Sequence, residues 1–94
     1  MNPVRAFHYV YILKSSKNGD LYTGCTADLK KRVAEHNDGK SRYTKTRGPY
    51  ELLYYEASLN KEDAFARERY LKSGMGKRYI NNRLKTQFKE ALTG

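Results

Sequence analysis

An arginine and a histidine lie four residues apart in the stretch LKKRVAEHN, at positions 32 and 36. Residues at this spacing share one face of a helix. Arginine binds phosphate through a planar guanidinium that is permanently charged, and histidine gains or loses a proton near neutral pH. Hydrolysis of a phosphodiester needs a cation on the phosphate, a proton acceptor for water and a stabilised leaving oxygen. Arg32 and His36 are candidates for the first two tasks.

The stretch DLYTGC at positions 20–25 places Tyr22 and Gly24 near the end of an expected strand. Glycine weakens the interior of a strand, so Gly24 calls for a further reason. Because glycine has no Cβ, it lets another group approach the backbone closely. A phenol at Tyr22, and another at Tyr11 on the preceding strand, are candidates for a site on this sheet.

The expected hairpin between these strands turns at Asn18-Gly19, a pair that tolerates the positive φ angles of a two-residue turn. That turn pairs Tyr11 with Thr26. It places Tyr22 on the same face of the sheet as Tyr11, about 13 Å away along the strand. The prediction is therefore adjacency of the two phenols on one face, without contact.

A glutamate interrupts the apolar stripe of a later helix, KEDAFARERYLKS. Ala64, Phe65, Glu68 and Leu71 follow the spacing of one helix face. A carboxylate among apolar side chains is costly unless something pairs with it. A metal ion or an arginine would do so, and Lys72, one turn later, is either that partner or a phosphate contact.

Each of these residues also has an ordinary structural explanation. Arg32 lies among lysines and can be a solvated charge, and His36 can be a favourable partner of a helix C-terminus. Tyr11 and Tyr22 can simply pack on the sheet, and Glu68 can be a lone salt-bridged acid. One residue at a time, the structural explanation is the stronger.

The elements expected around these residues are short. Strands are predicted over 7–13, 21–25 and 50–57, and helices over 29–37, 60–73 and 77–92. Asp28 and Asn60 cap the first two helices, and Gly74 and Gly76 separate the last two. The order ββαβαα predicts an α+β fold, a small three-stranded, mainly antiparallel sheet flanked by helices.

The chain is strongly basic, with a formal charge of +9 from 19 Lys and Arg against 10 Asp and Glu. Such a charge attracts polyanions, of which nucleic acid is the commonest. A polybasic membrane binder or a ribosomal-type protein would share this balance. The charge alone therefore selects no single function.

Length and composition narrow the class of protein. The 94 residues suit one domain over 1–94, and a single cysteine allows no internal disulfide and no four-ligand zinc site. The N-terminal apolar run is too short for a signal peptide, and no stretch approaches the ~20 apolar residues that span a bilayer. We expect a cytoplasmic protein that does not bind membranes; the sequence does not indicate its oligomeric state.

Taken together, the residues match a known pattern. It consists of Tyr11, ten intervening residues, Tyr22-Thr23-Gly24, Arg32 and His36 on a capped helix, and Glu68 on a later helix. This pattern resembles the GIY-YIG nuclease domain, over nearly the whole chain from about residue 7 to residue 82. It looks most like the small stand-alone proteins of that family. Tyr9-Val10-Tyr11 stands where the family has Gly-Ile-Tyr, and Thr23 stands for the isoleucine of the second motif.

The resemblance implies a metal-dependent endonuclease that hydrolyses phosphodiester bonds in DNA, in DNA repair or processing. It implies that Tyr11 and Tyr22 line the site and that Arg32 contacts the scissile phosphate. It implies that Glu68 ligates a single Mg²⁺ or Mn²⁺, and that His36 occupies a position held by histidine or tyrosine in active members. Tyr22 is the first candidate for general base and His36 the second.

Two other functions stay open. The degenerate motifs, and Cys25 where the excision-repair nuclease has lysine, favour a catalytically weak or inactive nucleic-acid-binding module. A basic protein that binds ribosomal RNA or a partner protein would need only the charge. In either nucleic-acid reading, backbone contacts are expected from basic side chains: Lys45, Arg47, Lys72, Lys77 and Arg78.

Overall fold

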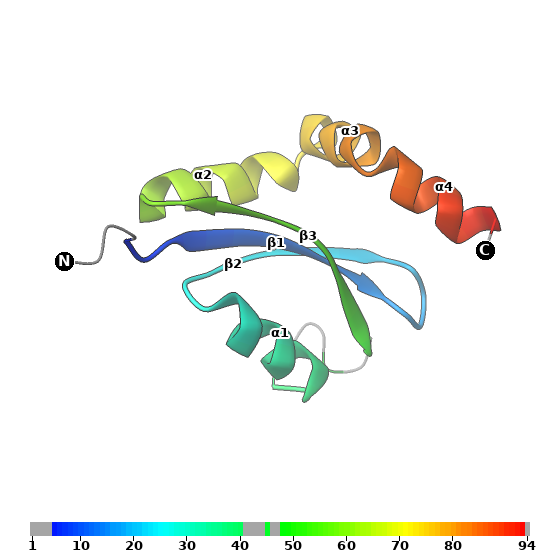
Figure 1. Cartoon of the computed structure of the whole chain (residues 1–94), viewed down its shortest axis with the longest axis horizontal. Coiled ribbons are helices and arrows are strands. Elements are labelled where there is room, and N and C mark those ends of the chain that lie inside the picture. Colours follow the sequence, from blue (N-terminus) through cyan, green and yellow to red (C-terminus); the bar gives the residue numbers. More distant parts are fainter. Residues whose placement is uncertain (1–4, 41–44, 46–47, 94) are drawn as a thin grey trace.

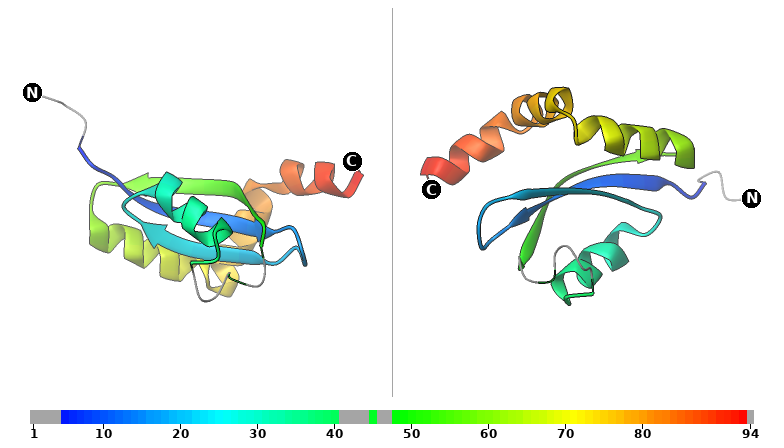
Figure 2. Two further views of the ribbon diagram at one scale, coloured as in Figure 1. Left: turned by 90° about the horizontal axis from the view of Figure 1, so that it is seen from below. Right: turned by 180° about the vertical axis from the view of Figure 1, so that it is seen from behind.

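A twisted antiparallel sheet separates two layers of helices in the computed structural model, which describes residues 5–40, 45 and 48–93 (Figure 1). The elements are β1 (His8–Ser15), β2 (Leu21–Thr26), α1 (Leu29–Asn37), β3 (Tyr50–Ser58), α2 (Lys61–Leu71), α3 (Gly74–Arg83) and α4 (Lys85–Thr93). Helix α1 covers one face of the sheet, and α2, α3 and α4 lie on the other (Figure 2). The predicted α+β class and the three-stranded sheet are confirmed.

The last part of the chain differs from its prediction. Two helices, α3 and α4, replace the single helix expected over 77–92, and they meet at Leu84. Gly74 and Gly76 do not lie between two helices, as predicted, but form the first turn of α3. Ser73 caps this helix, because its side chain accepts a hydrogen bond from the Gly76 amide. A Cβ at Gly76 would clash with the backbone of Tyr70, so glycine lets α3 begin directly against the end of α2.

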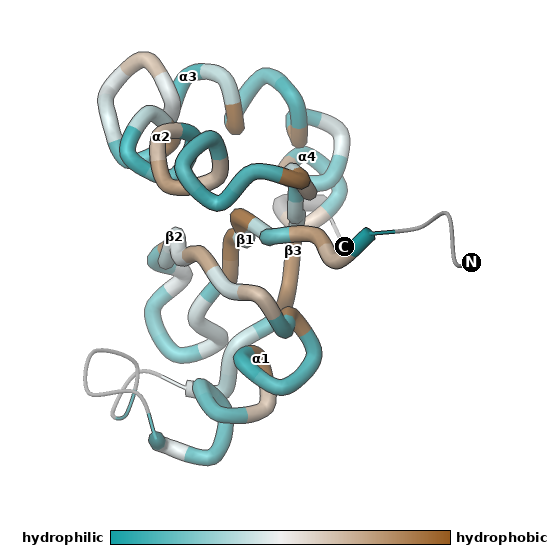
Figure 3. The backbone as a smooth tube through the Cα atoms, turned by 90° about the vertical axis from the view of Figure 1, so that its left-hand side faces the viewer, coloured by the Kyte–Doolittle hydropathy of each residue, from teal (hydrophilic) through white to brown (hydrophobic). Residues whose placement is uncertain are grey.

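Strand β1 is the centre of the sheet, in the order β2-β1-β3. Its residues alternate between the two faces, and Val10, Tyr11, Ile12 and Leu13 are at most 2% exposed. Val10 and Ile12 pack with Ala64, Leu71 and Ile80 under the α2–α4 layer. Tyr11 and Leu13 pack with Tyr50 on the α1 side. Figure 3 shows these hydrophobic stretches of the strands lying between the helix layers.

The hairpin between β1 and β2 has a different register from the predicted one. Tyr11 pairs with Gly24, not with Thr26. The turn contains four residues rather than two, because the Ser15 amide donates to the carbonyl of Asp20 at 2.9 Å and so continues the ladder. A shift of two residues leaves every side chain on its predicted face but moves Tyr11 directly opposite the glycine.

The side chain of Ser15 explains why the turn is wider than predicted. Its buried Oγ accepts hydrogen bonds from the amides of Lys17 at 3.1 Å and Asn18 at 3.3 Å. A serine hydroxyl that bonds to following amides stabilises a turn of its own. Gly19 then takes the positive φ of 78° that lets the chain return.

Side chains at both ends fix α1 in place. Asp28 caps its start, as predicted, with Oδ1 accepting from the Lys31 amide at 3.1 Å. At its end, the Asn37 side chain accepts from the Tyr50 amide at 2.7 Å and donates to the Tyr50 carbonyl at 3.2 Å. This double hydrogen bond, which the sequence analysis missed, ties α1 to the start of β3.

None of the helices in the described ranges has the length and apolar character needed to cross a bilayer.

We predict that Gly24→Ala destabilises the protein by about 1–3 kcal/mol, the usual cost of overpacking a filled site. A Cβ at this position would clash with the Tyr11 hydroxyl and Cζ, and Tyr11 is only 1% exposed. Urea unfolding followed by circular dichroism measures the change. Gly74→Ala is the matched control, because a Cβ there meets nothing within 4 Å. Equal stability of the two variants would show that Tyr11 is not held against Gly24.

Candidate active site

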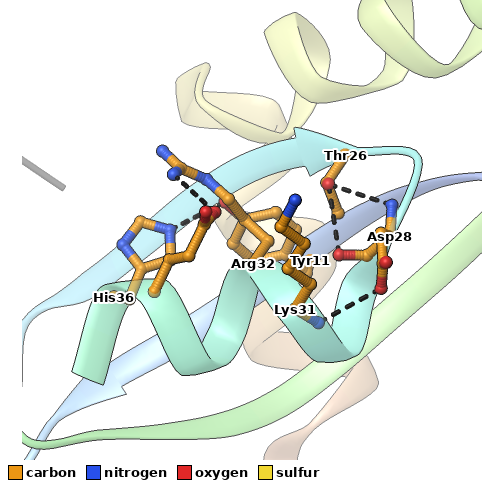
Figure 4. Close-up of polar contacts among 7 residues, drawn as sticks. Tyr11, Thr26, Asp28, Lys31, Arg32 and His36 are labelled. Carbon is orange, nitrogen blue, oxygen red and sulfur yellow. Dashed lines mark hydrogen bonds and ion pairs between the residues drawn. The ribbon is translucent and has the colours of Figure 1, made fainter. Parts of the chain in front are cut away.

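A buried hydrogen bond joins the central strand to α1. The Tyr11 hydroxyl lies 2.8 Å from Nε2 of His36 (Figure 4). Both residues are only 1% exposed. His36 belongs to the last turn of α1, so the helix brings an imidazole from one face of the sheet onto a phenol of β1.

Arg32, one turn before His36, lies close enough to the same phenol to oppose the rise of its pKa. A guanidinium has donors only, whereas a neutral imidazole has one nitrogen that can accept. Of these two neighbours only His36 can therefore take the hydroxyl proton of Tyr11, and we assign that proton to the bond with His36, with Nε2 as the acceptor. Arg32 is also paired with Glu35, its NH1 lying 3.3 Å from Oε1.

The electrostatics of the pair favour this assignment. Burial lowers the pKa of His36 below its ordinary value, and the charge of Arg32 lowers it further, which favours a neutral ring able to accept. Burial raises the pKa of Tyr11 to about 12, against the opposing effect of Arg32. At neutral pH the phenol keeps its proton and points it at the imidazole.

Tyr22 packs against the same imidazole. Its ring centroid lies 4.9 Å from that of His36, edge to face, and 6.3 Å from that of Tyr11. The predicted separation of about 13 Å between the two phenols is therefore wrong. The four-residue turn causes the difference. It pairs Tyr22 with Leu13, two residues from Tyr11, whereas the predicted turn paired it with Ser15, four residues from Tyr11.

Gly24 explains how the Tyr11 phenol reaches this place. Neighbouring strands lie about 4.8 Å apart, so a ring directed from β1 across β2 must pass over the residue opposite it. That residue is Gly24, and a side chain there would meet the phenol. The hydroxyl of Tyr11 thereby lies over β2, an edge strand, where it meets His36.

Glu68 approaches β2 from the other helix layer. It lies on α2, and its side chain is 19% exposed, so it does not turn out into solvent. Its charge contributes to raising the pKa of both Cys25 and Tyr11, after burial in each case, so it lies near β2 and near the phenol. Its Oε2 is 3.2 Å from Nζ of Lys72, the partner that the sequence suggested.

The donor set suits a metal that takes few protein ligands. Within the described residues, no three His, Cys, Asp or Glu side chains form a group that could hold a metal. Mg²⁺ commonly binds through one or two carboxylates, with waters and substrate phosphates completing its shell. Glu68 fits that role only if Lys72 releases it.

The predicted phosphate-contacting residues divide between two hollows. Lys45 lines a hollow of about 460 Å³ together with His36. Lys72 and Lys77 line a cleft of about 650 Å³ between β2 and the end of α2. Arg78 is exposed on α3 outside both hollows. Arg47 lies outside the described residues.

Comparison with known proteins supports the resemblance found in the sequence. A family described as the GIY-YIG catalytic domain matches residues 7–86. A UPF0213 protein of Clostridium perfringens is 50% identical over 66 residues, covering 69% of this chain and 70% of that protein. Another, of Haloquadratum walsbyi, is 43% identical over 68 residues, covering 71% of this chain and 75% of that protein.

A solved structure shares the fold. The solution NMR structure of the UPF0213 protein BH0048 from Bacillus halodurans is 38% identical and superposes with a TM-score of 0.51. The match covers 81% of this chain and 83% of that one. With the family match running from β1 to the start of α4, this chain belongs to the GIY-YIG family of nuclease domains.

Proposed function

We propose that this domain is an endonuclease that hydrolyses phosphodiester bonds in DNA, in cytoplasmic DNA repair or processing, with one Mg²⁺ or Mn²⁺ bound at Glu68. One observation supports the proposal most strongly. The Tyr11 hydroxyl lies 2.8 Å from Nε2 of His36, whose pKa is lowered, and the charges of Arg32 and Glu68 both act on that phenol. A phosphate binder and a proton acceptor thus meet at one oxygen.

Arg32 is suited to hold the scissile phosphate. Its side chain is 34% exposed, and its charge opposes the rise in the pKa of the buried Tyr11 phenol. Glu35 occupies part of the guanidinium, and a bidentate phosphate would replace this half-exposed carboxylate. The phosphate would then lie beside the Tyr11 oxygen. Its negative charge would be compensated by the Arg32 guanidinium, which is already oriented before the substrate binds.

The proton of the attacking water leaves through the Tyr11–His36 pair. The water gives a proton to the Tyr11 oxygen as Tyr11 passes its own proton to Nε2, so the phenol never has to ionise on its own. His36 is the acceptor because burial lowers its pKa and keeps it neutral at pH 7. Tyr22, whose ring packs on the imidazole, is the alternative acceptor.

Glu68 would hold the cation, and Lys72 would move from the carboxylate to a phosphate of the substrate. When bound, a divalent cation neutralises the phosphate and stabilises the leaving oxygen.

A nucleic-acid-binding module without cleavage is the second candidate function. The ion pair of Glu68 with Lys72, at 3.2 Å, favours it, because the carboxylate that would hold a metal already has a cation. The basic charge of +9 serves either function. Cleavage assays separate the two.

We predict that Glu68→Gln lowers the nicking of supercoiled plasmid in Mg²⁺ or Mn²⁺ by about 10²-fold or more, as expected when one electrostatic stabiliser is removed. Glu62→Gln, an exposed carboxylate in the first turn of the same helix, is the control and should nick like the parent. Branched DNA and structured RNA are assayed beside the plasmid. Binding of DNA without cleavage in every protein would establish the binding module, and binding confined to structured RNA would contradict the endonuclease and support a basic RNA-binding protein.

We also predict the pH dependence of single-turnover cleavage. A proton on His36 blocks the relay, so the rate falls at acid pH, with a midpoint below the ordinary pKa of histidine because burial lowers it. Above that midpoint the rate is flat, since the pKa of Tyr11 is raised to about 12. His36→Gln should remove the acid limb and lower the rate by about 10²–10⁴-fold. If Tyr22→Phe abolished cleavage while Tyr11→Phe did not, Tyr22 would be the acceptor instead.

A further inference from the structure

The cleft of about 650 Å³ adjoins the candidate active site and shares Tyr22 with it. Ile12, Leu71 and Ile80 line it, each 2% exposed, and form an apolar floor. Leu21, which is 41% exposed, lies on its β2 side. The polar residues around it are Asp20, Thr23, Lys72, Lys77 and Asn81.

The α3 wall of the cleft is rigidly attached. Arg67 of α2 forms a bidentate pair with Glu56 of β3, Nε to Oε1 at 2.9 Å and NH2 to Oε2 at 3.0 Å. Its guanidinium also lies over the ring of Tyr79 in α3, at 4.5 Å, and over that of Tyr70, at 5.0 Å. An arginine that is both paired and stacked holds its neighbours in one arrangement. The cleft is therefore preformed.

Its chemistry suits one nucleotide. A base in a duplex shows only its edges, because its faces are stacked, whereas an unpaired base offers an apolar face to a protein. The apolar floor would receive such a face, and the amide of Asn81 with the carboxylate of Asp20 would meet its polar edge. Lys72 and Lys77 would bind the flanking phosphates. The volume lies within the ~300–1,000 Å³ typical of small-ligand sites.

The cleft is continuous with the candidate active site. Lys72 lines the cleft and forms the ion pair with Glu68, and Tyr22 contributes to the cleft and packs on His36. A strand whose unpaired nucleotide occupied the cleft would pass Lys72 on its way to Glu68 and Arg32. A substrate with an unpaired nucleotide next to its scissile phosphate would fit this arrangement.

We infer that this cleft binds an unpaired nucleotide of the nucleic-acid substrate, so that the domain selects DNA with a bulge, flap or single-stranded end over fully paired duplex. This inference rests on the proposed function, whose site it extends.

Adjacent asparagines on α3 provide a matched test. Asn81 lines the cleft, and Asn82 does not; both are exposed, so neither substitution disturbs the core. Fluorescence anisotropy without divalent metal measures the affinity for a paired duplex and for the same duplex with one unpaired 2-aminopurine. The parent and Asn82→Phe should bind the bulged duplex about tenfold more tightly, in line with the value of stacking one base. Asn81→Phe should reduce this ratio to near one and remove the change in 2-aminopurine fluorescence.

The outcomes separate this inference from the proposed function. Equal affinity of the parent for both duplexes would overturn the cleft assignment while plasmid nicking still supported the nuclease. A preference that survived in Asn81→Phe would overturn it as well, because the unpaired nucleotide would bind elsewhere. Absence of both DNA binding and nicking in the parent would overturn the proposed function and the inference with it.

Discussion

The contact between the Tyr11 phenol and the backbone of Gly24 governs the arrangement of the site. β1 is the central strand, so a phenol directed from it toward the edge strand must cross over β2. A residue with a Cβ opposite Tyr11 would block the crossing. Because the position is glycine, the hydroxyl lies over β2, where it meets His36 and the charge of Arg32. Gly24, although unfavourable in a strand, thus makes room for the proposed catalytic groups to meet.

The two helix layers contribute different chemistry to this edge. From one side, α1 supplies a guanidinium that binds anions and an imidazole whose lowered pKa keeps it neutral. From the other side, α2 supplies the Glu68 carboxylate, which its ion pair with Lys72 compensates while it is partly buried. The central strand β1 is buried on both faces, whereas the edge strand β2 has mostly half-buried residues. The edge strand β2 is therefore where substrate, acid and base can come together.

Local sequence patterns predicted the elements well and the long-range contacts poorly. The capped α1, the shared face of Arg32 and His36, and the inward Glu68 follow from spacing within one helix, and the structure confirms all three. The hairpin register failed because the Ser15 hydroxyl outweighed the Asn-Gly preference at the turn. The Tyr11–His36 hydrogen bond joins residues 25 positions apart, so neither the strand pattern around Tyr11 nor the helix pattern around His36 predicts it. Similarly, the wall of the cleft depends on Arg67 lying between two tyrosines.

The tautomer of His36 tests the central claim most directly. The chain has only two histidines, so nitrogen-15 spectra of the imidazoles are simple, and His8→Gln assigns them. The account predicts that His36 carries its proton on Nδ1, accepts from Tyr11 at Nε2, and titrates below the ordinary pKa of histidine because of burial. In Tyr11→Phe the Nε2 resonance should shift toward that of an unbonded nitrogen. A proton on Nε2 in the parent, or a spectrum unchanged by Tyr11→Phe, would contradict the account.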